Sequence, residues 1–333
     1  MKNTIILSLL VLFFAGCKNT TSNKFPVLTE DYLSQVLPAE KAELFAPDIV
    51  STGMYERDVA ISPDGNEIYF SLFQGDWNTI MVTRRVNGVW QEPIVAEFAR
   101  DTSRYFAEPA FSPLNGNRIY YLSTLQGWKE QDIWVAERQA DGTWNAGKKL
   151  PENINLLGEF FPSFNNSNTL YFCRTDENTG ITQILRSKFV EGIYQNPEVL
   201  PAPINGKGTH FNAYISPDDS YLVGCVAGRD SLNPNMATYM LFFHNPDDTW
   251  SEGIDLIKEL DLPCSNAISI SVTSDGKYLF FASTYKTIRF KDMDPSWTKS
   301  LLQQRRTSFG NGNSDIYWMR FDGIVEKLRE KYQ

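Results

Sequence analysis

The residues best suited to chemistry in this chain are polar side chains near the start of the same strand in successive repeats. They are Glu56, Asp58, Glu108, Glu159, His210 and Asn212. Two carboxylates on either side of a glycosidic bond can act as general acid and as base or nucleophile. The same side chains can instead hold a ligand or partner by hydrogen bonds, without any reaction. The residue types therefore leave a glycoside hydrolase and a non-catalytic binding site open.

Other chemistries find little support in the sequence. The chain has two histidines, His210 and His244, and no Cys/His spacing typical of a zinc site. It also lacks a glycine-rich phosphate loop. The formal net charge of −9 disfavours nucleic-acid binding. We therefore expect no metal, no cofactor and no nucleic-acid partner, and we assign no catalytic residue.

The elements that position these residues belong to a fivefold repeat with a period near 50 residues. Each copy contains two turns with a tyrosine- or phenylalanine-rich strand between them. The first turn recurs as residues 62–65, 112–116, 165–168, 216–219 and 273–276. The second recurs, followed by an aromatic or branched residue, at 87–90, 141–144, 191–194, 247–250 and 322–325. Short strands and tight turns at such a period predict a β-propeller.

The first copy predicts four antiparallel strands, which is one blade: residues 58–61, 67–73, 79–86 and 90–95. Pro63 and Gly65 suit the first turn, and Asn87-Gly88 is a strong hairpin signal. The fifth copy lacks an outer strand, and residues 45–50 supply a matching sequence before the first copy. We therefore predict an all-β propeller over residues 45–325 whose N-terminal strand closes the last blade. Five blades are favoured, and six remain possible.

The repeats resemble a known family. The Ser-Pro-Asp-Gly turn at 62–65 followed by Ile-Tyr-Phe at 68–70, and Asp-Ile-Trp at 132–134, resemble the PD40 (WD40-like) repeats of TolB-like propeller proteins, which are common in Bacteroidota. The resemblance covers about residues 45–325 and is specific for fold rather than activity. It implies a binding platform for protein partners in the cell envelope. Copies three and four depart from the pattern, since 165–168 lacks Pro and Gly and 246–248 lacks Gly.

The N-terminus resembles a bacterial lipoprotein signal peptide. Lys2 precedes an apolar run at 5–14, and the sequence at 14–17 ends in Cys17, which the resemblance makes the lipid-bearing residue. The run is too short to span a bilayer. Residues 18–44 are then expected to form a tether with a short helical segment. Lys18 is not the Asp that is associated with inner-membrane retention of such lipoproteins, which favours the outer membrane. The tether also lacks the acidic run associated with surface export, so we expect the periplasmic face, with surface exposure left open.

The predicted site lies on the face that carries the connections between blades, where the loops are longest. Arg229, together with Arg174, follows the second strand of its repeat, resembling two members of the three-arginine clamp of sialidases, but no third arginine follows. The Ser-Pro-Asp-Gly turns also differ from the sialidase Asp box. The predicted function is a non-catalytic envelope lipoprotein that binds a protein or ligand. The alternative is a carbohydrate-active propeller, either a glycosidase or a glycan-binding protein. A C-terminal helix is expected at 324–333.

Overall fold

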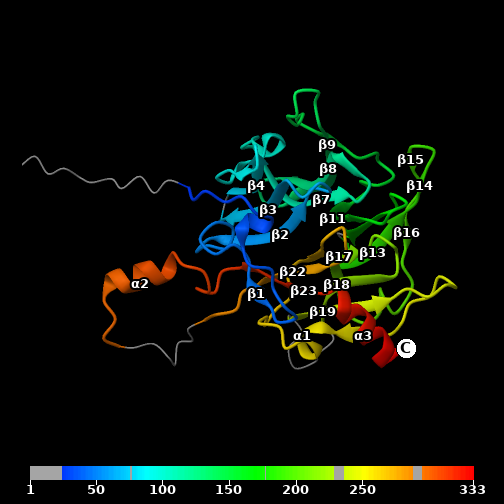
Figure 1. The fold of residues 1–333 in the computed structure, drawn as a ribbon. Helices are drawn as coiled ribbons and strands as arrows, with labels where there is room; N and C mark the ends of the chain where they lie inside the picture. The colour runs from blue at the N-terminus through cyan, green and yellow to red at the C-terminus, as the bar shows by residue number, and fades with distance from the viewer. Residues whose placement is uncertain (1–24, 76, 177, 229–235, 288–294) are drawn as a thin grey trace, which may run out of the picture.

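The computed structural model describes residues 25–333 apart from 76, 177, 229–235 and 288–294. Apart from one two-stranded hairpin, its strands form five antiparallel sheets arranged around a common axis (Figure 1). This arrangement confirms the all-β prediction and the five-bladed propeller. Arg229 lies outside the described residues, as does the region before residue 25 that contains Cys17.

Each blade runs from an innermost strand near the axis to a short outer strand. The strands of the first three blades are β2 (Tyr55–Ile61), β3 (Glu67–Gln74), β4 (Trp77–Val86), β5 (Val89–Trp90) and β6 (Ile94–Val95); β7 (Arg104–Ser112), β8 (Asn115–Leu125), β9 (Lys129–Glu137) and β10 (Lys148–Lys149); β11 (Gly158–Phe164), β12 (Leu170–Asp176), β13 (Ile181–Ser187) and β16 (Glu198–Val199), with the small hairpin β14 (Phe189–Val190) and β15 (Ile193–Tyr194). The strands of the last two are β17 (Thr209–Ile215), β18 (Tyr221–Ala227), β19 (Ala237–Phe243) and β20 (Ile254–Asp255); β21 (Ile270–Val272), β22 (Tyr278–Ser283), β23 (Asp315–Arg320) and β1 (Glu43–Leu44).

The first turn of each repeat is built by its side chains as well as by its backbone. In blade 1 the Ser62 hydroxyl accepts a hydrogen bond from the Glu67 amide at 2.9 Å, and Gly65 has a φ of 72°. A positive φ is easy for glycine, and asparagine and aspartate tolerate it better than most residues. In copies three and four, Asn168 (φ 56°) and Asp219 (φ 64°) also adopt positive φ in this turn, and Asp248 (φ 63°) does so in the second turn of copy four. The departures from the sequence motif therefore preserve the turn.

The ring is closed by the N-terminal strand, as predicted, but in a different register. β1 pairs with Tyr317 and Trp318 of β23, and the Phe45 amide continues the ladder to the Ile316 carbonyl at 2.8 Å. The predicted strand at 45–50 is instead a turn. Ala46 has a φ of 42°, and its carbonyl accepts hydrogen bonds from the amides of residues 49–51. Closure therefore uses the two residues before the predicted segment.

Helices occupy the periphery. They are η1 (Tyr32–Ser34), η2 (Glu97–Ala99), α1 (Leu256–Glu259), α2 (Lys299–Arg306) and α3 (Asp322–Tyr332). Helix α3 is the expected C-terminal helix, and it begins two residues before the predicted start. Among the helices in the described part of the chain, none is long and apolar enough to cross a membrane.

The hydrophobic core lies between blades rather than within one layer. One cluster joins blades 1 and 2, where the rings of Phe98 and Tyr121 stack with centroids 4.6 Å apart and Trp144 packs against Phe98 at 6.2 Å. Similar clusters fill the other seams. Because the blades support one another, the inner strands hold fixed positions around the axis.

Candidate functional site

The innermost strands of blades 1 to 4 share a bulge that turns one residue toward a left-handed backbone conformation. The residues with positive φ at this place are Asp58 (58°), Glu108 (58°), Phe161 (53°) and Asn212 (49°). Each lies in a register shift between the first and second strands of its blade. A β-bulge re-aims side chains locally, and bulges are frequent beside functional sites. Asp58 and Glu108 therefore occupy the same position in neighbouring blades.

The bulged amides are held by side chains that differ from blade to blade. The Asp58 amide donates to the Ser269 hydroxyl at 3.2 Å, and the Glu108 amide donates to the Ser71 hydroxyl at 2.9 Å. The Asn212 amide donates to Cys173 Sγ at 3.1 Å. Since buried amides need acceptors, these contacts stabilise the strained backbone.

Asp58 and Glu108 share one cation, the guanidinium group of Arg57. Arg57 Nε lies 2.8 Å and 2.9 Å from the two Asp58 oxygens, and its Nη2 lies 3.1 Å from Glu108 Oε1. Glu108 Oε2 accepts a hydrogen bond from the Phe161 amide at 2.7 Å. Both carboxylates are buried. Burial raises the pKa of Glu108, an effect that Arg57 opposes and the Asp58 carboxylate reinforces.

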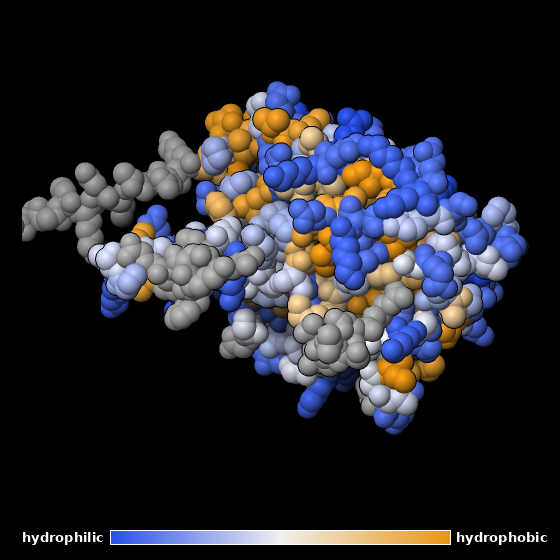
Figure 2. All heavy atoms as spheres, turned by 90° about the horizontal axis from the view of Figure 1, so that it is seen from below, coloured by the Kyte–Doolittle hydropathy of each residue, from blue (hydrophilic) through white to orange (hydrophobic). Residues whose placement is uncertain are grey.

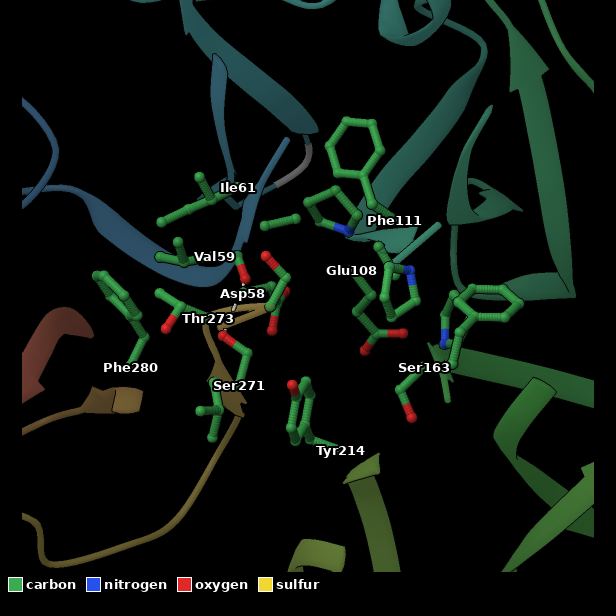
Figure 3. A pocket seen from close by; sticks show the side chains of 18 of the residues that line it. Asp58, Val59, Ile61, Glu108, Phe111, Ser163, Tyr214, Ser271, Thr273 and Phe280 are labelled. Carbon is green, nitrogen blue, oxygen red and sulfur yellow. Dashed lines mark hydrogen bonds between the residues drawn. The ribbon is translucent and has the colours of Figure 1, made fainter. Parts of the chain in front are cut away.

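These two carboxylates lie at the inner end of a cavity on the propeller axis. The cavity has a volume of about 90 Å³. Its walls are mainly apolar and come from all five inner strands, including Val59, Phe111 and Phe164. The side chains of Asp58, Glu108, Tyr214 and Ser271 surround it in Figure 3. The axis thus holds a mostly apolar pocket with an acidic pair and one arginine at its inner end.

The cavity reaches the face opposite the one predicted. Pro63, Pro113 and Ser274, which also line it, belong to the first turns of blades 1, 2 and 5. We expected the site on the face with the connections between blades. The structure brings Asp58 and Glu108 together as the sequence suggested, but the accessible end of their cavity is on the turn face.

The other predicted residues do not line this cavity. Glu159 is fully buried and forms an ion pair with Arg174 at 2.5 Å, and it also accepts hydrogen bonds from the Leu157 amide at 2.9 and 3.1 Å. Burial raises the pKa of Glu159, and the Leu157 and Arg174 contacts oppose that rise. Arg174 is thus committed to a buried partner rather than free to clamp a sugar carboxylate.

His210 contacts the backbone just before its own strand, and Asn212 contacts the backbone that leads into blade 5. His210 Nε2 lies 3.3 Å from the Lys207 carbonyl oxygen, and Asn212 Nδ2 donates to the Ile268 carbonyl at 2.6 Å. Glu56 lies in a separate cleft between blades 5 and 1. Of the predicted residues that the structure describes, Asp58 and Glu108 alone line the axial cavity.

Arg57 is a site residue that the sequence reasoning missed. The available signal was a basic residue directly before Asp58, at a strand position where the other inner strands carry apolar residues, such as Ala107 and Phe160. In the described ranges no group of three or more His, Cys, Asp or Glu residues could hold a metal ion.

No protein-family model matches this chain, and no curated protein matches it. Similar solved structures include TolB from Acinetobacter baumannii, at 13% identity and a TM-score of 0.47 over 80% of this chain and 54% of that one. The chain thus spans about half the length of that protein. A putative TolB from Agrobacterium tumefaciens gives 14% identity and a TM-score of 0.46, covering 80% of this chain and 91% of the other.

A glycosidase is also among the similar structures. The α-L-arabinofuranosidase PaAbf62A from Podospora anserina gives 12% identity and a TM-score of 0.44, covering 85% of this chain and 94% of that one. At such low values these likenesses do not separate a binding platform from an enzyme. The choice between them depends on the geometry of the site.

Proposed function

We propose that this protein is a non-catalytic binding platform of the cell envelope, and that the axial cavity on the turn face receives an apolar side chain or small group of its partner. The observation that carries the proposal is the contact of Arg57 with both Asp58 and Glu108. Because Arg57 donates hydrogen bonds to both carboxylates, these oxygens are already occupied and are not free to exchange protons with a substrate.

The shape of the cavity supports the same proposal. Its volume of about 90 Å³ is well below that of typical small-molecule pockets, which is roughly 300–1,000 Å³. Apolar walls at the centre of a polar surface are typical of pockets that take up one anchoring side chain. A glycosidase needs room for a sugar ring and for an attacking water between its two carboxyl groups. The binding role therefore fits the geometry better than hydrolysis.

The resemblance of residues 1–17 to a lipoprotein signal peptide supports an envelope location. We propose that Cys17 carries the lipid and anchors the protein in the outer membrane, with the propeller facing the periplasm. Incorporation of radiolabelled palmitate into the wild-type protein, and its loss in Cys17→Ala, tests the anchor. Fractionation of the two membranes by density then tests the location.

The binding role is tested with two variants at one turn of blade 5. Ser274→Trp places a large ring at the cavity rim, whereas Lys277 is exposed directly after the same turn and does not line the cavity, so Lys277→Trp is the control. Envelope proteins are crosslinked to each form in intact cells and identified. We expect one partner to be lost with Ser274→Trp and kept with Lys277→Trp. An equal pattern for both variants, or release of sugars from envelope glycans by the wild type, would contradict the proposal.

A further inference from the structure

A second hollow lies off the axis, at the seam where blade 5 meets blade 1. Its volume is about 630 Å³, which is within the usual range for small-molecule pockets. Its walls come from the N-terminal segment, from strands β3 and β4, and from the chain that follows helix α2. We call this hollow the seam cleft. It is independent of the axial cavity and of the function proposed for it.

The structure places a buried carboxylate with an unused oxygen in the seam cleft. Glu56 is 1% exposed. Its Oε1 accepts a hydrogen bond from the Thr52 hydroxyl, whereas Oε2 has no hydrogen-bond partner among the described residues. Glu56 forms no ion pair with any described cation either. An unsatisfied buried carboxylate oxygen is costly, so a ligand that donates to it gains more than it would from an exposed one.

The remaining lining defines what kind of ligand fits. One wall is apolar and includes Phe70, Leu72 and Met81. This wall would pack against a hydrocarbon or aromatic body, since burying apolar surface is favourable by roughly 25 cal/mol per Å². A ligand that fits both features has an apolar body and a hydrogen-bond donor at one end, so it is amphiphilic.

The charges around the cleft favour a cation. Asp48 and Glu92 line it, are exposed and form no ion pair with any described residue. Arg306 is the basic residue among the described lining residues. Three carboxylates, Glu56 included, therefore face one guanidinium group. Such a surplus attracts positive ligands and disfavours carboxylates and phosphates.

We propose that the seam cleft binds small amphiphilic amines, with the apolar body against Phe70, Leu72 and Met81 and the ammonium group donating to Glu56 Oε2. Such binding gives a role to a glutamate that lies at a buried position between two blades.

The charge state of Glu56 supports this assignment. Burial raises the pKa of Glu56 to about 7, and Asp315 on β23 adds to the rise while Thr52 opposes it. The other charged groups that face this space are Asp48, Glu92 and Arg306. Near neutral pH, part of the Glu56 population is therefore protonated. An ammonium ion at Oε2 favours the carboxylate, so amine binding should release protons from Glu56.

The first test compares three ligands with the same hydrocarbon chain. Calorimetric titration of the purified protein with n-octylamine, 1-octanol and octanoate is carried out below their aggregation limits at about pH 8. We expect octylamine to bind at least tenfold more tightly than octanol, and octanoate to bind most weakly, because a charge-assisted hydrogen bond replaces a neutral one. Equal binding of amine and alcohol would overturn the proposal.

The second test uses matched variants. Glu56→Gln keeps the shape and removes the charge, and we expect it to lower octylamine affinity at least tenfold while octanol affinity stays within about twofold. Glu92→Gln removes an exposed charge of the same type, and we expect a change of less than about threefold. Unchanged amine affinity in Glu56→Gln would exclude Glu56 as the acceptor.

A third measurement needs no variant and so does not depend on whether Glu56→Gln folds. Octylamine binding to the wild type at about pH 7 is measured in buffers with different ionisation enthalpies. Because octylamine stays protonated there, any released proton comes from the protein. We expect net proton release, declining toward about pH 9 as Glu56 becomes fully ionised. Binding without proton exchange at every pH would contradict the assignment.

Discussion

At the scale of single residues, Arg57 is the cation that allows two acidic side chains to lie side by side near the axis. The side chains of Asp58 and Glu108 are 2% and 7% exposed, so neither carboxylate can rely on water for stabilisation. Breaking a buried ion pair by removing one partner is far more damaging than replacing the whole group by apolar or neutral residues. The arginine is therefore a stability determinant as well as part of the site.

The first prediction concerns the loss of this cation. Arg57→Met should lower the free energy of unfolding by about 3–5 kcal/mol near neutral pH, because it leaves two buried carboxylates without a counter-charge. Urea unfolding of the two proteins measures the difference. The triple variant Arg57→Met/Asp58→Asn/Glu108→Gln serves as the control and should recover most of the loss. If the triple variant is as unstable as the single one, the arginine acts through packing and not through charge.

The second prediction concerns pH and Glu56. Its folded-state pKa of about 7 lies above the ordinary glutamate value, so the native protein binds more protons than the unfolded chain between about pH 4.5 and 7. Stability from this group is fully present below about pH 4.5 and is lost as the pH rises to about 7. Glu56→Gln lacks this loss and should be more stable than the wild type at pH 8, by on the order of 3 kcal/mol.

Unfolding curves at several pH values measure this effect. Between about pH 4.5 and 7 the wild-type free energy of unfolding should decline more steeply than that of Glu56→Gln. Parallel pH profiles for the two proteins would show that Glu56 titrates normally. Asp315, whose pKa burial raises to about 6, should contribute a slope of the same sign in both proteins.

Part of the candidate site could be predicted from the sequence, and the reason lies in the repeat. Asp58 and Glu108 stand at equivalent places in successive copies, so the fold had to bring them together at the axis. Arg57 could not be assigned in the same way. Whether residue 57 or 58 faces the axis is decided by a bulge, and the bulge depends on contacts with neighbouring blades, such as the Ser269 hydroxyl.

At the scale of elements, the blade-to-blade connections are braced by asparagines that the repeat analysis did not single out. Asn155 Oδ1 accepts from the Ile133 amide at 2.9 Å, and Asn205 Oδ1 accepts from the Ile184 amide at 2.8 Å. Both asparagines end a Leu-Pro-x-x-Ile-Asn sequence, at 150–155 and 200–205. This repeated sequence was a signal for the two bracing asparagines. This sequence recurs in two of the five copies, whereas the turns and strands recur in every copy.

The sequence predicts that an N-terminal strand closes the ring, but it does not predict which residues of that strand pair with β23. The sequence at 45–50 matches the missing outer strand in composition, yet a short outer strand is fixed by few hydrogen bonds. We infer that burial decides the outcome, because Phe45 and Val50 are both fully buried in the structure, where the chain turns at Ala46. The packing of these two apolar side chains therefore sets the register, so that residues 43–44 pair with β23 in place of the predicted segment at 45–50.

The third prediction tests this closure. Phe45 packs against the rings of Phe280 at 5.0 Å and Trp318 at 5.1 Å. Phe45→Ala should lower the free energy of unfolding by about 3–5 kcal/mol, since it leaves a cavity in a fully buried aromatic cluster. Thermal and urea unfolding measure the loss. Val36→Ala, at an exposed position in the same N-terminal segment, is the control and should change stability by less than about 0.5 kcal/mol. Equal losses in the two variants would refute the closure.

At the scale of the whole molecule, helix α3 ties the end of the ring to its neighbours (Figure 1). Its residues Ile324, Val325 and Leu328 are buried in the cluster that joins blades 4 and 5. The Arg329 guanidinium lies over the Phe243 ring at 4.2 Å, and Lys327 pairs with Glu40 of the N-terminal segment at 2.6 Å. The helix therefore covers the seam next to the one that the N-terminal strand closes.

At the surface, the hollows that could hold a ligand or partner side chain are local. Figure 2 shows apolar and polar residues interspersed over one side of the molecule, without a single continuous apolar sheet. Specific binding then depends on local hollows, of which the axial cavity and the seam cleft combine apolar walls with buried carboxylates. The two hollows differ in volume and in the pairing of their carboxylates: Arg57 forms ion pairs with both carboxylates of the first, whereas Glu56 in the second forms no ion pair with a described residue.

The fourth prediction removes helix α3 by ending the chain at Phe321. Three buried apolar side chains would be lost from the seam of blades 4 and 5, and each contributes roughly 1.5–3 kcal/mol. We expect a lower unfolding midpoint and faster amide hydrogen exchange in β18, β19 and β22, while β8 and β12, in blades 2 and 3, keep their protection. Lys331→Ala, which removes the exposed ion pair with Glu259, is the control and should leave the unfolding midpoint and the pattern of protection close to those of the wild type. Uniform loss of protection in all five blades would instead mean that the ring unfolds as one unit and that α3 stabilises every seam through closure.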